Sequence, residues 1–260
     1  MRSVRQKSRV SATVRTARAQ KASFTRKLLA WWARAARDLP WRQTRDPYRV
    51  LVSEFMLQQT QVSRVAEYYP RFLERFPDLE TLARARPRAV REAWDGLGYY
   101  ARASNLHALA KQVSGAGGQV PDDPAELAKL PGVGPYTAGA VATFAYEKPV
   151  PAVDTNVNRV LRRVFFDRAT GNLQRATKIW DLARTLVPKD GKRAWKFNQA
   201  IMELGALVCK ARAPQCNQCP VQPVCKTGRR LGTRQAARRL AAVRAEGAVS
   251  PTYGLMPSPR

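Results

Sequence analysis

Apolar residues recur at helical spacing along most of the chain between residues 24 and 208. The two clearest stripes are Phe197, Ile201, Leu204 and Val208, and Ile179, Leu182 and Leu186. Such spacing keeps apolar side chains on one face of a helix, and residues 63–76, 87–95 and 100–113 also look helical, separated by prolines and glycines. Because no alternating pattern bounded by hairpin turns interrupts them, the sequence predicts an all-α fold.

The composition bounds the class of protein. A hydrophobic content of 45% is sufficient for a sizeable core in a chain of 260 residues. No apolar run approaches the length of a membrane-spanning helix, so we expect no membrane partner. Lys and Arg number 46 against 19 Asp and Glu, which gives a formal net charge of +27. So large an excess of positive charge favours nucleic acid as a partner.

The positive charge is concentrated at both ends of the chain. Residues 1–23 and 227–260 are rich in Lys and Arg and lack apolar periodicity, so we predict two basic, disordered arms around a folded region over residues 24–226. The first segment also resembles an organelle transit peptide. Because a bacterial codon bias would produce the same composition, we expect a cytoplasmic, nucleoid-associated bacterial protein, with organelle targeting as the alternative.

Four cysteines, the only ones in the chain, lie close together as Cys209, Cys216, Cys219 and Cys225. Two disulfides would suit a small secreted protein better than a chain of this length without an apolar signal segment. A zinc ribbon brings its ligands as two close pairs, whereas only Cys216 and Cys219 form such a pair. Four thiolates at uneven spacing favour an iron–sulfur cluster, which takes one thiolate at each corner.

Two glycines mark a tight bend within residues 130–139, which read Leu-Pro-Gly-Val-Gly-Pro-Tyr-Thr-Ala-Gly. Because Gly132 and Gly134 flank Val133, the backbone can approach a phosphate there. The helix that starts at Pro135 would present free N–H groups to the same phosphate. The pattern favours a helix–hairpin–helix clamp on the DNA backbone, with an ordinary αα-turn as the alternative.

Glu54 lies within residues 50–61, where apolar residues surround it on nearly every side of a helix. Such a carboxylate either reaches solvent at the helix edge or is partly buried with a raised pKa, which suits a general acid at neutral pH. Gln58, Gln59 and Gln61 follow in the same segment. Their amide groups can read base edges or fill a gap in a base stack.

Asp154 precedes an apolar helix that contains Val157, Val160 and Leu161, so we expect it to be the N-cap of that helix. An N-cap role does not exclude a catalytic one, because a helix N-terminus favours the ionised form of a carboxylate. A protonated Glu54 opposite an ionised Asp154 is the pairing that cleaves a glycosidic bond.

Together these segments closely resemble the helix–hairpin–helix DNA glycosylases, and among them the MutY-type adenine DNA glycosylases. The matching segments are Ser53–Gln61, Gly96–Ala103, Leu130–Gly139, Val153–Asp154, Phe197–Gln199 and the four cysteines. The resemblance covers about residues 24–226. The glutamine-rich helix and the tyrosine pair are specific to the adenine glycosylases, whereas the hairpin and the cysteine spacing are shared with endonuclease III.

The resemblance implies a role for individual residues at the reacting bond. Glu54 would protonate adenine at N7 and later help water to attack, and Asp154 would stabilise the sugar cation. Tyr136 and Asn156 would support that charge.

Further residues would contact the DNA. The resemblance places Trp41, Arg42 and Gln199 around the adenine, and it implies that Gln59 and Tyr99 enter the duplex at the lesion. The four cysteines would hold a [4Fe-4S] cluster. The partner would be double-stranded DNA with a mismatched or damaged base pair, and we expect the protein to be a monomer.

The resemblance also implies two lobes with DNA across the cleft between them. Residues 46–152 would form a six-helix domain with the hairpin, and residues 24–45 would join 153–226 in a cluster lobe. Tyr136 stands where endonuclease III relatives carry a Schiff-base lysine, so we predict a monofunctional glycosylase. Two departures stand out: Thr155 replaces a common glycine, and the segment after Lys226 is too short for the 8-oxoguanine-recognising domain of many relatives.

Two other functions remain open at this point. A thymine or uracil glycosylase for G·T and G·U mismatches shares the hairpin tyrosine and the catalytic aspartate, although the Gln58–Gln61 stretch favours adenine. A non-catalytic, cluster-stabilised DNA-binding module is the alternative from another class, and the presence of both Glu54 and Asp154 argues against it.

Overall fold

The structure, a computed structural model, describes residues 2–166 and 172–231. The helices are α1 (Arg2–Ala35), α2 (Pro47–Leu57), α3 (Val62–Arg75), α4 (Leu79–Arg84), α5 (Pro87–Ala93), α6 (Ala101–Gly115), α7 (Pro124–Leu127), α8 (Pro135–Tyr146), α9 (Thr155–Phe165), α10 (Asn172–Leu186) and α11 (Gly191–Leu207). Short 3₁₀ turns are η1 (Pro40–Arg42), η2 (Cys216–Gln218) and η3 (Gln222–Val224). The described residues contain no strand, so the predicted all-α fold is confirmed.

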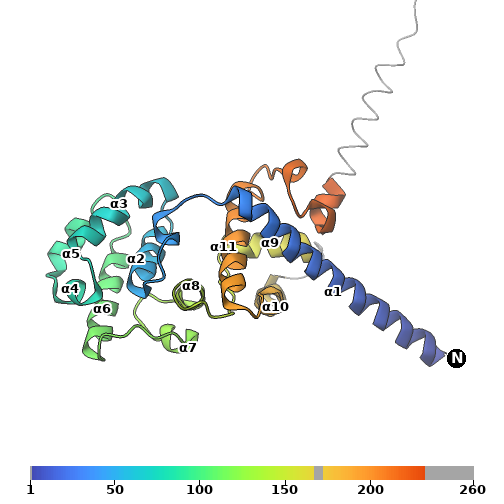
Figure 1. Ribbon diagram of the computed structural model, residues 1–260, viewed down its shortest axis with the longest axis horizontal. Coiled ribbons are helices and arrows are strands. Elements are labelled where there is room, and N and C mark those ends of the chain that lie inside the picture. The colour runs from blue at the N-terminus through green and yellow to red at the C-terminus, as the bar shows by residue number, and fades with distance from the viewer. Residues whose placement is uncertain (1, 167–171, 232–260) are drawn as a thin grey trace, which may run out of the picture.

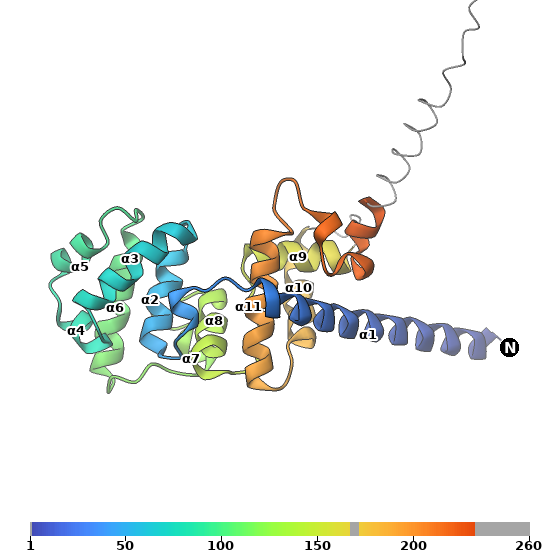
Figure 2. The same ribbon diagram turned by 45° about the horizontal axis from the view of Figure 1, so that its top comes forward.

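The helices pack around two separate hydrophobic cores (Figures 1 and 2). The first core contains buried residues between Leu39 and Ala152, from α2 to α8, together with Trp195 of α11. The second core joins Phe24 and Leu28 of α1 to apolar side chains of α9, α10, α11 and the loop that ends at Cys225. The described part of the chain therefore starts and ends in the same half of the molecule, and the other half is formed by the residues between.

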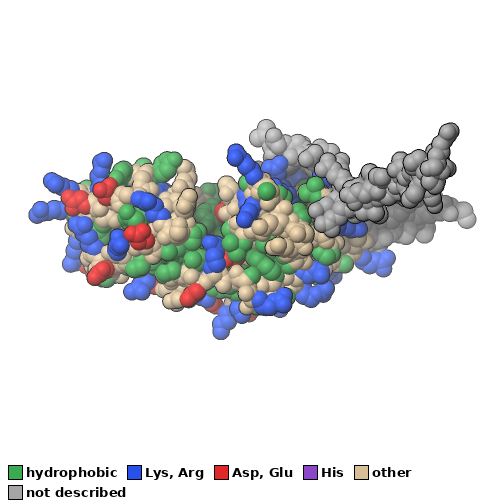
Figure 3. All heavy atoms as spheres, turned by 90° about the horizontal axis from the view of Figure 1, so that it is seen from above, with side chains coloured by type: hydrophobic (Ala, Val, Ile, Leu, Met, Phe, Trp, Pro, Cys, Tyr) green, Lys and Arg blue, Asp and Glu red, His purple; other side chains and the backbone are tan. Residues whose placement is uncertain are grey.

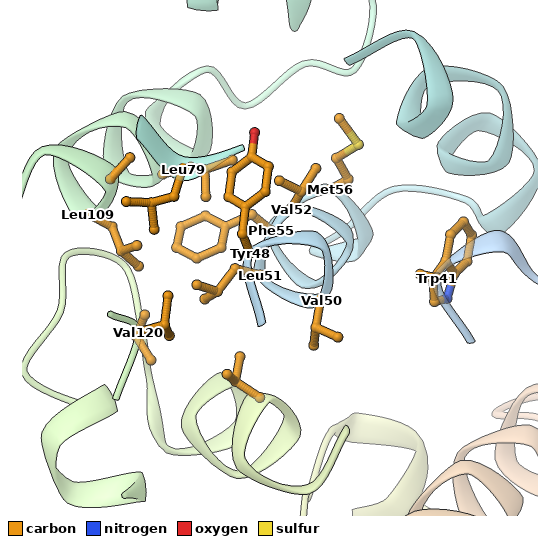
Figure 4. Packing of buried hydrophobic residues seen from close by; sticks show 14 of the residues in the cluster. Trp41, Tyr48, Val50, Leu51, Val52, Phe55, Met56, Leu79, Leu109 and Val120 are labelled. Atoms are coloured by element: carbon orange, nitrogen blue, oxygen red, sulfur yellow. The ribbon is translucent and has the colours of Figure 1, made fainter. Parts of the chain in front are cut away.

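Helix α2 is buried on nearly all sides in the first core. Pro47 starts the helix, and the side chain of Asp46 accepts a hydrogen bond from the backbone N–H of Arg49 at 2.8 Å, which caps the first turn. Apolar side chains extend from α2 in several directions toward its neighbours (Figure 4). The polar side chains of Ser53 and Glu54 in the middle of α2 are therefore kept out of water, and this placement sets the environment of Glu54.

The N-terminal segment differs from the expected disordered arm over residues 1–23, because α1 already begins at Arg2. Alanine, arginine and lysine favour helix even without an apolar stripe. α1 runs away from the body of the molecule toward the N-terminus (Figure 1), but Gln20 still donates a hydrogen bond to the carbonyl oxygen of Val224 at 2.8 Å. The predicted basic tail over residues 227–260 lies largely outside the described residues.

No helix in the described part of the chain is long and apolar enough to cross a membrane.

Candidate active site

A cleft runs between the two halves of the molecule, and Figure 3 shows the surface hollowed there. Its walls come from η1, α2, α8, the start of α9 and α11. Eight of the residues that we predicted from the sequence line it: Trp41, Arg42, Glu54, Gln59, Tyr136, Asp154, Asn156 and Gln199. Segments up to about 160 residues apart in the sequence therefore meet around one space, as a binding site requires.

Glu54 is the central polar group of the cleft. It is 4% exposed, and its Oε2 accepts a hydrogen bond from the Tyr136 hydroxyl at 2.8 Å. Burial raises the pKa of Glu54 to about 7, the Tyr136 hydrogen bond lowers it in part, and the nearby charge of Asp154 raises it again. Of the two environments open from the sequence, the structure shows the buried one, and a carboxyl group with this pKa can donate a proton at neutral pH.

Tyr136 reaches Glu54 from the first turn of α8. Burial and the neighbouring carboxylate of Glu54 raise the pKa of Tyr136 well above its ordinary value. The phenol therefore stays protonated and acts as a hydrogen-bond donor to Glu54.

Asp154 is the N-cap of α9, as predicted. Its Oδ1 accepts from the backbone N–H of Val157 at 2.6 Å, and its Oδ2 accepts from the Asn156 amide at 2.8 Å. Burial raises the pKa of Asp154, while the hydrogen bonds from Val157 and Asn156 lower it in part. The net direction is opposite to the effect expected from a helix N-terminus alone, because the cleft removes water from the carboxylate.

The first turn of α9 is held in place by Arg159. Its Nη2 donates to Asn156 Oδ1 at 2.7 Å and to the Gly205 carbonyl at 2.8 Å, and its Nε donates to the Cys209 carbonyl at 2.8 Å. Gly205 lets the backbones approach, since a Cβ there would lie 2.6 Å from Asn156 Cβ. Hydrogen bonds thus connect Asp154 through Asn156 and Arg159 to the cysteine loop.

Arg42 and Gln199 form one wall of the cleft through a shared network. Arg42 donates to Gln199 Oε1 at 2.8 Å and to Glu203 Oε2 at 2.8 Å, and Arg37 pairs with Glu203 Oε1 at 2.7 Å. Burial alone would raise the pKa of Glu203, but the two arginines outweigh it and lower that pKa to about 2. Because Arg42 holds the oxygen of the Gln199 amide, the NH₂ group of Gln199 is left for a ligand.

The sequence interpretation missed Glu203. It is 1% exposed and lies on α11 between the apolar residues Met202 and Leu204. An acid inside an apolar stripe was the available signal, and the same signal had identified Glu54. Its arginine partners lie more than 160 residues earlier in the chain, which no local pattern shows.

The predicted duplex-entering residues share an unusual backbone. Gln59 has φ +57° and Tyr99 has φ +48°, so both are in the left-handed region, where a residue other than glycine costs about 1–3 kcal/mol. Two large hydrophobic side chains are exposed among the described residues, Tyr99 at 64% and Leu231 at 38%. Gln59 lines the cleft, whereas Tyr99 does not.

The predicted hairpin is present between α7 and α8. Gly132 has φ +73°, and a Cβ there would lie 2.7 Å from Asn105 Cβ. Gly134 is the N-cap of α8, and Val133 between the glycines is buried. The geometry suits a close backbone approach, so a DNA-phosphate contact at this turn stays our prediction.

All four cysteines line one small apolar cavity, with Val160, Val164, Leu204, Val208 and Val221 around them. The cysteines form no disulfides. Arg163 donates to Cys209 Sγ at 3.3 Å, and the backbone N–H of Gly228 donates to Cys225 Sγ at 3.2 Å. No three His, Cys, Asp or Glu side chains of the described residues are arranged to hold a single metal ion. The four thiols match the donor set of a cluster with four separate corners.

Comparison with known proteins places the chain among base excision repair proteins. The family model described as "HhH-GPD superfamily base excision DNA repair protein" matches residues 52–185. The adenine DNA glycosylase of Rattus norvegicus is 46% identical over 224 residues, which are 81% of this chain and 42% of that protein. That of Mycolicibacterium smegmatis is 46% identical over 196 residues, which are 75% of this chain and 66% of that protein.

Other relatives are matched over nearly their whole length. The thymine-DNA glycosylase of Aeropyrum pernix is 38% identical over 78% of this chain and 93% of that protein. The structure of a thermostable thymine-DNA glycosylase has a TM-score of 0.76 at 31% identity and covers 82% of this chain and 99% of the other. The structure of a trapped endonuclease III–DNA covalent intermediate has a TM-score of 0.67 at 26% identity, and the match covers 79% of this chain and 94% of the other. The chain thus spans less than half of its mammalian relatives.

Proposed function

The chain belongs to the HhH-GPD superfamily of base excision DNA repair proteins, and we propose that it is a monofunctional adenine DNA glycosylase. Its substrate would be double-stranded DNA in which adenine lies opposite 8-oxoguanine or guanine. One observation carries the proposal: the buried Glu54 carboxyl group, with a pKa of about 7, lies beside Tyr136 and Asp154 in the cleft.

The reaction follows from these groups. Because its pKa is raised to about 7, the Glu54 carboxyl group can hold a proton at neutral pH, and this proton passes to N7 of adenine. The bond between C1′ of the sugar and N9 of the base then breaks, and its electron pair leaves with the adenine. The Asp154 carboxylate stabilises the positive charge at C1′. A water molecule adds to C1′ and returns a proton to Glu54, so the carboxyl group is restored.

Tyr136, at the position where endonuclease III relatives carry a lysine, supports a monofunctional enzyme. Strand cleavage by β-elimination needs a lysine or N-terminal amine that forms an imine with the sugar. The cleft-lining residues include no lysine in the part of the chain that the structure describes, and Tyr136 occupies the first turn of α8 next to Glu54. Borohydride should therefore not trap the protein on DNA, and efficient trapping would contradict this part of the proposal.

Thymine is the alternative base, and a specific finding favours it. The matched thymine-DNA glycosylases are covered over 93% and 99% of their length, more than the matched adenine glycosylases. The adenine glycosylases of Rattus norvegicus and Mycolicibacterium smegmatis are 46% identical to this chain, against 38% for the Aeropyrum pernix thymine enzyme. Chemistry agrees with adenine, because a purine has a basic ring nitrogen that a neutral Glu54 can protonate, whereas thymine has none.

Single-turnover excision on four duplexes tests the choice of base. The duplexes carry A·8-oxoguanine, A·G, T·G and U·G pairs, and the Glu54→Gln variant is the control. We expect excision from the first two and none by the variant. Excision of thymine or uracil alone would refute the adenine assignment, and binding without any excision would favour a DNA-binding module.

We also propose that Cys209, Cys216, Cys219 and Cys225 hold a [4Fe-4S] cluster. Its iron–sulfur bonds would fix the loop between α11 and residues 226–231 next to the α9 arginines. A Cys216→Ser variant should lose visible absorbance and iron content, with Cys→Ser changes at the other three positions acting alike. Unchanged iron content in all four variants would exclude these residues as ligands.

A further inference from the structure

Two loops carry the strained residues that we expect to enter the duplex. Gln59 follows the C-terminus of α2, and Tyr99 precedes the N-terminus of α6. Both have a left-handed backbone, which persists only where surrounding contacts enforce it. The contacts that enforce it converge on one side chain, that of Arg102.

Arg102 lies in the first turn of α6 and is 7% exposed. Toward the α2 side its Nη1 lies 3.0 Å from Phe55 O, 2.8 Å from Met56 O, 2.5 Å from Gln58 O and 3.0 Å from Thr60 Oγ1. The carbonyls at the end of a helix have no partner within that helix. A cation placed there is favoured by the helix dipole, so Arg102 caps α2 immediately before Gln59.

The other side of the same guanidinium holds the second loop. Its Nη2 donates to Leu97 O at 3.1 Å and to Gly98 O at 2.9 Å, and its Nε donates to Tyr99 O at 3.4 Å. The guanidinium carbon Cζ of Arg102 also lies 5.7 Å from the centre of the Tyr99 ring. One rigid planar group therefore contacts the backbone directly before Gln59, the Thr60 hydroxyl directly after it, and the backbone directly before and at Tyr99.

The partners of Arg102 indicate a geometric role. Among the described residues it makes no ion pair, and its hydrogen-bond acceptors are carbonyl oxygens and one hydroxyl group. A buried cation without a carboxylate is costly, and an uncharged side chain would suffice to fill the space. The fixed fork of the guanidinium can span two loops at once, which a single ammonium group cannot.

We propose that Arg102 is a positioning residue that sets the separation of the Gln59 and Tyr99 loops, so that both side chains enter the duplex together around the mispair. The inference rests on the proposed glycosylase function. Arg102 does not line the cleft that contains Glu54, so it acts through the opening of the base pair and not at the reacting bond. Its loss slows extrusion of the target base, while the Glu54 chemistry is unchanged.

The test separates base opening from bond cleavage. In the Glu54→Gln background, 2-aminopurine replaces the adenine opposite 8-oxoguanine, and its fluorescence rises when the base leaves the stack. Arg102→Lys keeps the charge and Arg102→Met keeps most of the volume. We expect each of these two substitutions to reduce the unstacked fraction of 2-aminopurine. In the protein that keeps Glu54, we expect each to lower the single-turnover excision rate by about tenfold. Arg91→Met, which removes an exposed arginine 4.7 Å from the Tyr100 ring, is the matched control and should leave both values unchanged.

A double-mutant cycle distinguishes positioning from general stability. In a Tyr99→Ala background, Arg102→Lys should change excision less than about threefold, because one of the two positioned groups is already gone. Equal effects in both backgrounds, or wild-type unstacking in a folded Arg102→Lys protein, would overturn the proposal. If the Arg102→Met protein does not fold, the Arg102→Lys protein alone is used for both measurements.

A failure of the proposed adenine glycosylase function can be told apart from a failure of the Arg102 proposal. If the wild-type protein excises only thymine, the same cycle is measured on T·G duplexes. If it excises nothing, the fluorescence measurement alone decides whether Arg102 controls base opening.

Discussion

Replacing Glu54 by glutamine measures how much the buried acid reduces the stability of the folded protein. Glutamine has nearly the same shape and keeps one oxygen that can accept the Tyr136 hydrogen bond. The pKa of Glu54 is raised from 4.5 to about 7 in the folded state, so the folded protein binds more protons than the unfolded chain between these values. Stability therefore falls as the pH rises through this window.

The magnitude follows from the same two values. Linkage gives a loss for the wild-type protein of about 1 kcal/mol at pH 5 and about 3 kcal/mol at pH 8.5, compared with an unshifted carboxyl group. Glu54→Gln cannot ionise and avoids this loss. We expect the stability gained by the substitution to grow by about 2–3 kcal/mol between the two pH values.

Chemical denaturation of both proteins in the same two buffers measures this change. All other titrating groups are common to both proteins. The change in the stability gain between the two pH values therefore reports the ionisation of Glu54 alone. A stability gain that does not change between pH 5 and 8.5 would refute a raised pKa, and with it the general-acid argument. Excision by the wild-type protein should fall about tenfold for each pH unit above about 7, as the acid loses its proton.

Three further predictions concern the supports of the cleft. Tyr136→Phe removes a hydrogen bond that lowers the pKa of Glu54, so the alkaline limb of the pH–rate profile should move to higher pH; a limb at lower pH would contradict this. Gly205→Ala places a methyl group 2.6 Å from a Cβ atom of α9, and denaturation should show a loss of about 1–3 kcal/mol; an unchanged midpoint would show that the helices can separate. Arg42→Met removes one of two arginines from the buried Glu203 and should cost about 2 kcal/mol at pH 7. The depressed pKa of Glu203 adds stability above about pH 4.5 that is lost as the pH falls toward about 2, so the cost should shrink at pH 3, and a constant cost would exclude this pair.

The hydrophobic pattern was sufficient to predict the helices. The stripe before Cys209 became α11, and the segments at 63–76, 87–95 and 100–113 became α3, α5 and α6 with ends shifted by one or two residues. Local spacing also predicted the bend at Gly132. These features depend on neighbours in the sequence, which a periodic pattern records directly.

The supports of the site were not predictable in the same way. The Arg37–Glu203 pair joins residues separated by 166 positions, and Arg102 binds carbonyls more than forty residues earlier. Backbone carbonyls have no sequence signature, and glutamine gives no sign of a left-handed φ at Gln59. The helix over residues 2–23 was missed because it has no apolar face to detect.

The arrangement of the two cores also sets an order of events during synthesis on the ribosome. Residues 39–152 supply nearly the whole first core, so this half can fold as soon as it has emerged. Phe24 and Leu28 are made earlier, but their partners begin at Val153. At about 5–20 residues per second, the intervening stretch of about 125 residues takes on the order of 10 s to translate. During that interval Phe24 and Leu28 of α1 are not yet covered by their partners. The cysteine cavity forms last, when residues 209–225 have been made and pack against α9 and α11.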